Sequence, residues 1–126
     1  MVDATTLTTV DELDNWLNKK QQDPPLQQRL QLVQFSAPWC HLCPNMKQKL
    51  LDIAVDDGPI DIAHVNTPDA EDLVEKMEVS RLPLVLVFAA GEIAARVTGL
   101  DFEALTQALT MARWQLHGVA ATETDF

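Results

Sequence analysis

The chain has 126 residues, of which 47% are hydrophobic, and this is the size and composition of one globular domain. Its formal net charge of -10 repels nucleic-acid phosphates and anionic lipid, so neither class of partner is expected. The start of the sequence lacks the basic and apolar pattern of a signal peptide, and its most apolar run, residues 82–90, is too short to span a bilayer. We therefore expect a cytoplasmic protein, although an export signal removed beforehand would leave no trace.

The first half of the chain alternates between helical and extended patterns. Thr9 and Glu12 have the spacing of a capping box, in which each side chain accepts a hydrogen bond from the other residue's backbone. Apolar residues at helical spacing follow the box. The predicted elements are a helix over residues 10–20, a loop over 21–28, a strand over 30–35 and a helix over 40–54.

The second half adds three strands and two helices. The nearly continuous apolar run 84–88 is typical of a central strand, and the turn at 90–92 predicts a hairpin. Asp101 is placed to cap the last helix. The predicted elements are strands over residues 60–65, 84–88 and 93–98 and helices over 68–77 and 102–116. We assign residues 1–117 to the domain and residues 118–126 to a flexible acidic C-terminal tail.

This order of elements predicts an α/β fold. Strands joined through helices are expected to be parallel neighbours, whereas the hairpin adds an antiparallel edge. The sequence therefore predicts a mixed sheet with helices on both faces.

The chain holds two cysteines, Cys40 and Cys43. A small secreted scaffold would carry more, and a loop this short restricts the unfolded chain too little to explain the pair by stability. The pair lies where a predicted strand gives way to a helix, whose N-terminus favours the thiolate at Cys40. Cys43 lies one turn further on, is expected to be more buried and is the better resolving thiol.

His41 lies between the two cysteines. If protonated or donating a hydrogen bond, it would stabilise the Cys40 thiolate and make the pair more oxidising. Two other interpretations stay open, a metal site and an inert pair on a non-redox fold. Zinc needs about four ligands, and beyond one cysteine pair the chain offers the scattered His41, His64 and His117, so no metal is expected.

Residues 33–43, with Trp39 directly before Cys40, resemble the strand and active site of the thioredoxin family. Leu82 and Pro83, followed by the apolar run, resemble that family's cis-proline loop and central strand. The resemblance covers nearly all of the chain except the tail. It implies a thioredoxin fold and thiol–disulfide oxidoreductase activity.

The resemblance also implies roles for individual residues. It makes Cys40 the nucleophile and Cys43 the resolving cysteine. The residues that resemble the family's apolar docking rim are Trp39, Leu82, Pro83 and Gly99. A cis peptide before Pro83 would present the Leu82 backbone to an extended substrate, and the other interpretation of Pro83 is a strand-entry proline.

Three departures from the family pattern concern the tuning of the cysteines. His41 and Leu42 replace the family's usual Gly-Pro. Gln34 stands where the family has a buried acid, and an amide cannot accept a proton at neutral pH. His64 replaces a nearby lysine, where it is either a base that titrates near pH 7 or a core histidine with a satisfied ring. These changes put general reductase activity in question.

We consider two functions. In the first, a monomer exchanges disulfides or thiols with protein substrates, needs no cofactor beyond its redox-active disulfide, and receives electrons from a thioredoxin reductase or glutathione. In the second, the same surface holds or chaperones a protein with little redox turnover. Loss of the buried acid favours the second function, whereas the presence of both cysteines and Trp39 opposes it.

Overall fold

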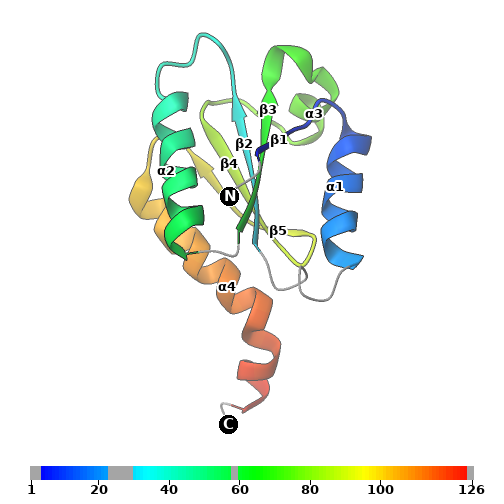
Figure 1. Cartoon of the computed structure of the whole chain (residues 1–126), viewed down its shortest axis with the longest axis vertical. Coiled ribbons are helices and arrows are strands. Elements are labelled where there is room, and N and C mark those ends of the chain that lie inside the picture. The colour runs from blue at the N-terminus through cyan, green and yellow to red at the C-terminus, as the bar shows by residue number, and fades with distance from the viewer. Residues whose placement is uncertain (1–3, 23–29, 58–59, 125–126) are drawn as a thin grey trace.

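The computed structural model describes residues 4–22, 30–57 and 60–124, in which five strands form one mixed sheet with helices on both faces (Figure 1). In chain order the elements are β1 (Ala4–Thr6), α1 (Val10–Gln22), β2 (Leu30–Ser36), α2 (Cys43–Asp57), β3 (Ile60–Asn66), the 3-10 helix η2 (Thr67–Asp69), α3 (Glu71–Lys76), β4 (Leu84–Ala89), β5 (Glu92–Thr98) and α4 (Phe102–Thr124). Most of the loop expected over residues 21–28 lies outside the described residues.

The strands lie in the order β1-β3-β2-β4-β5. The first three run parallel, whereas β4 is antiparallel to both β2 and β5. The expectation that helix-linked strands run parallel is therefore wrong for β4, because the chain passes from β3 through η2 and α3 and re-enters the sheet at the end where β3 leaves it. A bulge between Val87 and Phe88 interrupts the pairing of β4 with β5. The short β1 was not predicted, since three residues carry no usable pattern.

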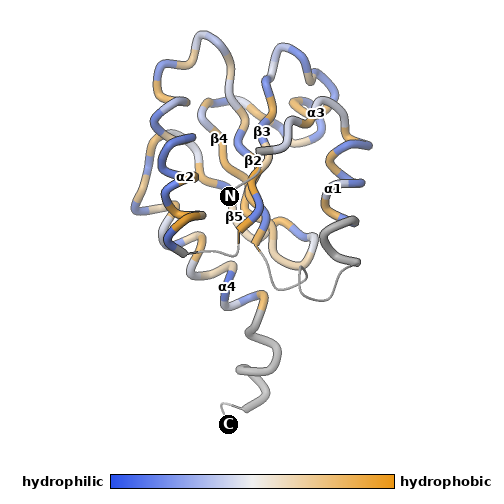
Figure 2. The backbone as a smooth tube through the Cα atoms, in the orientation of Figure 1, coloured by the Kyte–Doolittle hydropathy of each residue, from blue (hydrophilic) through white to orange (hydrophobic). Residues whose placement is uncertain are grey.

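Alternation along β2 sends its side chains to two separate apolar layers. Leu32 belongs to the layer beneath α2 and α4, and Gln34 has the same parity along the strand. Val33 and Phe35 belong to the layer beneath α1 and α3. Figure 2 shows the apolar strands enclosed between helices whose outer faces are hydrophilic. The central strand is thus buried on both sides.

Side-chain caps begin two of the helices. The Glu12 amide donates to Thr9 Oγ1 at 3.1 Å, and the Thr9 amide donates to Glu12 Oε1 at 3.1 Å, which confirms the predicted capping box of α1. The Ala104 amide donates to Asp101 Oδ1 at 2.9 Å and caps α4 as expected.

The last helix is longer than predicted. It runs to Thr124, past the expected end at Leu116, and projects beyond the rest of the fold (Figure 1). Gly118 lowers helix propensity by about 1 kcal/mol relative to alanine, which weakens a helix without ending it. The assumed boundary at residue 117 therefore falls inside α4, and the flexibility of residues 118–126 stays a prediction.

None of the helices in the described part of the chain is long and apolar enough to cross a membrane.

Replacing Leu86 with alanine tests the two-layer core. Leu86 is 0% exposed in β4, so Leu86→Ala is expected to lower the free energy of unfolding by about 3 kcal/mol through lost burial and the cavity left behind. Val55→Ala is the matched control, because Val55 is 74% exposed on α2 and its loss is expected to change stability by less than about 0.5 kcal/mol. Urea unfolding of both variants measures the difference, and equal losses would contradict the layer assignment.

Candidate active site

The cysteine pair lies at the turn between β2 and α2. Residues 37–42 form the turn, in which the Cys40 amide donates to the Ala37 carbonyl at 3.0 Å. The helix begins at Cys43, later than the predicted start at Cys40. Cys40 therefore precedes the helix, and Cys43 is its first residue. Pro44 follows directly, where its missing N–H costs no helical hydrogen bond.

A disulfide joins Cys40 and Cys43, whose Cα atoms are 5.5 Å apart. The two residues differ in access to solvent, since Cys43 is 4% exposed and Cys40 is half-buried. An approaching thiol or disulfide therefore reaches Cys40 first.

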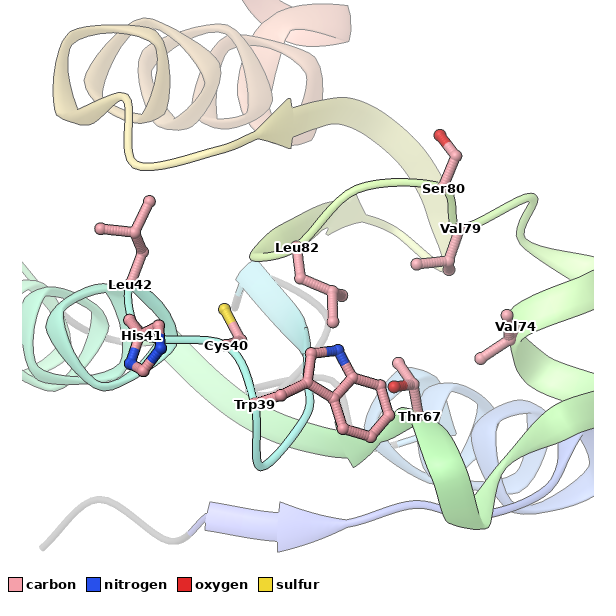
Figure 3. A pocket seen from close by; sticks show the side chains of 9 residues that line it. All are labelled: Trp39, Cys40, His41, Leu42, Thr67, Val74, Val79, Ser80 and Leu82. Atoms are coloured by element: carbon pink, nitrogen blue, oxygen red, sulfur yellow. The ribbon is translucent and has the colours of Figure 1, made fainter.

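Cys40 opens onto a mainly apolar pocket of about 520 Å³, hereafter the docking groove. Figure 3 shows the Cys40 sulfur between Leu42 and Leu82, with the Trp39 ring directed toward Thr67. Trp39 is 66% exposed and Leu42 is 46% exposed. The other residues that line the groove are His41, Val74, Val79 and Ser80. Large apolar side chains left in solvent around a reactive sulfur mark a surface for binding another protein.

One wall of the docking groove is the loop before β4. The Leu82–Pro83 peptide bond is cis, and the Gly99 amide donates to the Pro83 carbonyl at 2.8 Å. Gly99 has φ +82° with open space where a Cβ would stand, so its backbone conformation and not crowding requires glycine. Of the four predicted rim residues, Trp39 and Leu82 line the groove. Pro83 is buried behind them, and its carbonyl accepts the hydrogen bond from the Gly99 amide.

Behind the disulfide lies the amide of Gln34, which is 1% exposed. Its Nε2 donates to the Cys43 carbonyl at 3.0 Å and so ties the sheet to the first turn of α2. Its Oε1 is buried without a hydrogen-bond partner in the described part of the chain. Gln34 also lines a second pocket of about 320 Å³, hereafter the rear pocket, together with both cysteines and Lys47. The interior beside Cys43 is therefore polar but carries no acid at this position.

His64 is the register partner of Gln34 across β2 and β3, so the two side chains are neighbours on one face of the sheet. Burial, and secondarily the charge of Lys47, lower the pKa of His64 to about 4. His64 is therefore neutral at pH 7 and does not titrate there, contrary to the first interpretation. Its Nε2 is buried without a hydrogen-bond partner among the described residues.

The sequence interpretation missed Lys47 as a member of the site. The signal was present, because Lys47 follows Cys43 by four residues and so lies on the same side of a helix. The groove residues from η2 and α3 were also missed, since their place beside Cys40 depends on the path between β3 and β4. His41 is exposed and lines the docking groove beside Cys40. Within residues 4–22, 30–57 and 60–124, no three His, Cys, Asp or Glu side chains are placed to hold a metal ion.

The model of the family described as "Thioredoxin" matches residues 7–111. The chain belongs to the thioredoxin family. It is 33% identical over 80 residues to a thioredoxin of Staphylococcus haemolyticus, covering 63% of this chain and 77% of that protein. It is 36% identical over 78 residues to a thioredoxin of Chlamydia pneumoniae, covering 61% of this chain and 76% of that one.

Solved thioredoxin structures share the fold of this chain. The structure superposes on Fasciola hepatica thioredoxin with a TM-score of 0.73 at 24% identity, covering 84% of this chain and 96% of that chain. A thioredoxin of Nicotiana alata gives a TM-score of 0.72 at 19% identity, with coverage of 87% and 93%. The predicted thioredoxin fold is confirmed.

Family membership and the Cys40–Cys43 pair make this chain a thiol–disulfide oxidoreductase. The thioredoxin family acts on protein disulfides and needs no cofactor beyond its redox-active disulfide. The alternative of a binding module with little redox turnover is not favoured.

The low pKa of His64 predicts a specific loss of stability in acid. The pKa of His64 is about 4 in the folded chain and 6.5 ordinarily, so the unfolded chain binds more protons between these values and stability falls as the pH falls through that window. Because His64 is only partly buried, we expect a contribution of about 1–2 kcal/mol rather than the full value of the shift.

Urea unfolding of the oxidised protein and of His64→Gln, at about pH 7 and about pH 4.5, measures this contribution. The variant should lose less stability than the wild type on acidification, because carboxylates titrate in both proteins and cancel in the comparison. Identical losses would show that His64 does not resist protonation.

Proposed function

We propose that Cys40 is the attacking thiol of this oxidoreductase and Cys43 the resolving thiol. The observation that carries this assignment is the unequal access of the two residues, one at the docking groove and the other 4% exposed beneath it. Cys40 also lies in the turn just before the N-terminus of α2, where unpaired N–H groups and the helix dipole favour a thiolate.

The proposed reaction begins when the Cys40 thiolate attacks a disulfide of a protein substrate. One substrate sulfur leaves as a thiolate, and a mixed disulfide forms with Cys40. Cys43 then loses its proton and attacks the Cys40 sulfur, which closes the Cys40–Cys43 disulfide and releases the second substrate thiolate. The substrate gains two electrons, and the cysteine pair loses them.

The substrate is proposed to bind as an extended segment across the docking groove. Trp39 and Leu82 are the apolar contacts, and the Leu82 backbone offers hydrogen bonds in the manner of an added strand. Pro83 and Gly99 support that backbone through their hydrogen bond. His41 at the mouth and Gln34 and His64 behind the disulfide are the proposed tuning residues.

The physiological setting is also proposed. A cytoplasmic location fits a chain whose two cysteines form one redox pair, since cytosolic disulfides are mostly catalytic. There, a thioredoxin reductase or glutathione would return electrons to the pair. A single domain suffices for the exchange, so we propose a monomer, and the net charge of -10 disfavours nucleic-acid and membrane partners.

Serine variants test the division of labour between the cysteines. Cys43→Ser is expected to attack substrate and to accumulate a mixed disulfide with it, because the resolving step is lost. Cys40→Ser is expected to form no such adduct and to reduce insulin disulfides no faster than dithiothreitol alone. Mass spectrometry of the trapped species makes the comparison, and an adduct on Cys43 in the Cys40→Ser protein would reverse the assignment.

The reduction potential of the pair tests the tuning by His41. Stabilisation of the Cys40 thiolate favours the dithiol form, so we expect a potential less negative than about -270 mV, the value of thioredoxin. His41→Gln should make it more negative by roughly 5–20 mV, the amount that corresponds to an exposed charge interaction. Thiol labelling across a graded dithiol buffer gives both values, and an unchanged potential in the variant would remove His41 from the tuning groups.

A further inference from the structure

The resolving cysteine has a neutral environment at its inner side. Gln34 cannot accept a proton, and His64 on the adjacent strand is neutral at pH 7. The paired strand β4 (Leu84–Ala89) carries no ionisable side chain. Among the residues that line the rear pocket with Cys43, Lys47 is the one with a charged side chain.

The geometry points to Lys47 as the positioning residue that stabilises the Cys43 thiolate during the resolving step, a role that rests on the proposed function. Lys47 lies four residues after Cys43, about 40° further around α2. It lines the rear pocket with both cysteines and Gln34. An ammonium group there favours a negative charge at Cys43 Sγ without taking its proton.

Two further observations support this assignment. The charge of Lys47 reaches the interior beside Gln34, because it is one of the causes that lower the pKa of His64. The buried Gln34 Oε1 has no partner in the described part of the chain, and because it is an acceptor it can only favour the protonated form of a nearby thiol. The ammonium group of Lys47, which lines the same pocket, offsets that preference.

The resolving step then proceeds without a protein base. The Cys43 thiol releases its proton to solvent through the rear pocket, and Lys47 stabilises the resulting thiolate. The thiolate attacks the sulfur of Cys40 in the mixed disulfide, a Cys40–Cys43 bond forms, and the bond from Cys40 to the substrate breaks. The substrate leaves as a thiolate and takes a proton from solvent.

The first test titrates Cys43 as a single thiol, through thiolate absorbance in the Cys40→Ser background. Adding Lys47→Gln is expected to raise the pKa of the Cys43 thiol by about half a unit, a shift reduced from that of a buried pair because Lys47 is exposed. Lys47→Arg should restore the lower pKa of the Cys43 thiol. Salt at about 1 M should reduce the difference in this pKa between the proteins with and without Lys47.

Lys49→Gln is the matched control. It removes the same charge from the same helix, but Lys49 lies over the Phe102 ring of α4, at 5.2 Å from the ring centroid, away from the rear pocket. The control should leave the pKa of the Cys43 thiol unchanged. No shift in Lys47→Gln, or an equal shift in Lys49→Gln, would overturn the proposal.

The second test follows the resolving step in the protein with both cysteines. The reduced protein reacts with dithiobis(nitrobenzoate), which leaves a thionitrobenzoate group in a mixed disulfide with Cys40. Attack by Cys43 then releases this group as a coloured thiolate, and its absorbance gives the rate of the resolving step. With a pKa raised by half a unit the thiolate fraction falls about threefold, but the more basic thiolate is a better nucleophile, so Lys47→Gln should slow the release about twofold near pH 7. The pH dependence of the release rate should shift to higher pH in Lys47→Gln and return to that of the wild type in Lys47→Arg.

These outcomes separate the two proposals. A wild-type protein that fails to reduce protein disulfides would contradict the proposed function, while the thiol titration would still report on Lys47. A Lys47→Gln protein that loses stability but keeps the pKa of Cys43 and the release rate would show a merely structural lysine.

Discussion

The change of direction between β2 and α2 is the constraint on which the site depends. β2 is buried on both faces from Leu30 to Phe35, and the hydrogen bond from Gln34 to the Cys43 carbonyl holds the first turn of α2 against it. The turn between these two elements has to leave one sulfur beneath the helix and the other at the surface. The proposed order of attack and resolution thus follows from where a strand stops and a helix begins.

The same constraint determines which groups can tune the pair. A position on β2 that faces the start of α2 is closed to water, and an unpaired charge there would be costly. An amide at this position avoids that cost and binds a backbone carbonyl instead. Charge beside the pair is then confined to the solvent side, on Lys47, where its effect is weaker and depends on salt. The interior beside Cys43 is therefore neutral at this position and has no side chain there that could act as a base.

Much of this arrangement could be predicted from the sequence because it is local. Thr9 with Glu12 and Asp101 predicted two helix starts, the apolar run at residues 84–88 predicted the central strand, and the spacing of Cys40 and Cys43 predicted the reactive pair. The resemblance to the thioredoxin family added the cis-proline loop and the rim, of which Trp39 and Leu82 line the groove.

What could not be predicted depends on contacts between distant parts of the chain. The direction of β4 depends on the path of residues 67–83, which no periodicity encodes. The pKa of His64 depends on burial against Gln34 and on the charge of Lys47, three residues from three different elements. A pattern can suggest that a histidine is near a site, but its protonation is a property of the assembled interior.

The outer edge of the sheet at β5 has a consequence for how the protein behaves in a crowded solution. An open edge strand is a template on which another chain can add, and it is a common starting point for aggregation. Here the bulge at Val87 and Phe88 bends the pairing, and the Arg96 guanidinium is held at this edge by the carbonyls of Met77 and Glu78. A second strand pairing along β5 would have to follow an irregular ladder and desolvate a fixed cation. The irregular ladder and the held Arg96 therefore make β5 a poor template for the addition of another strand.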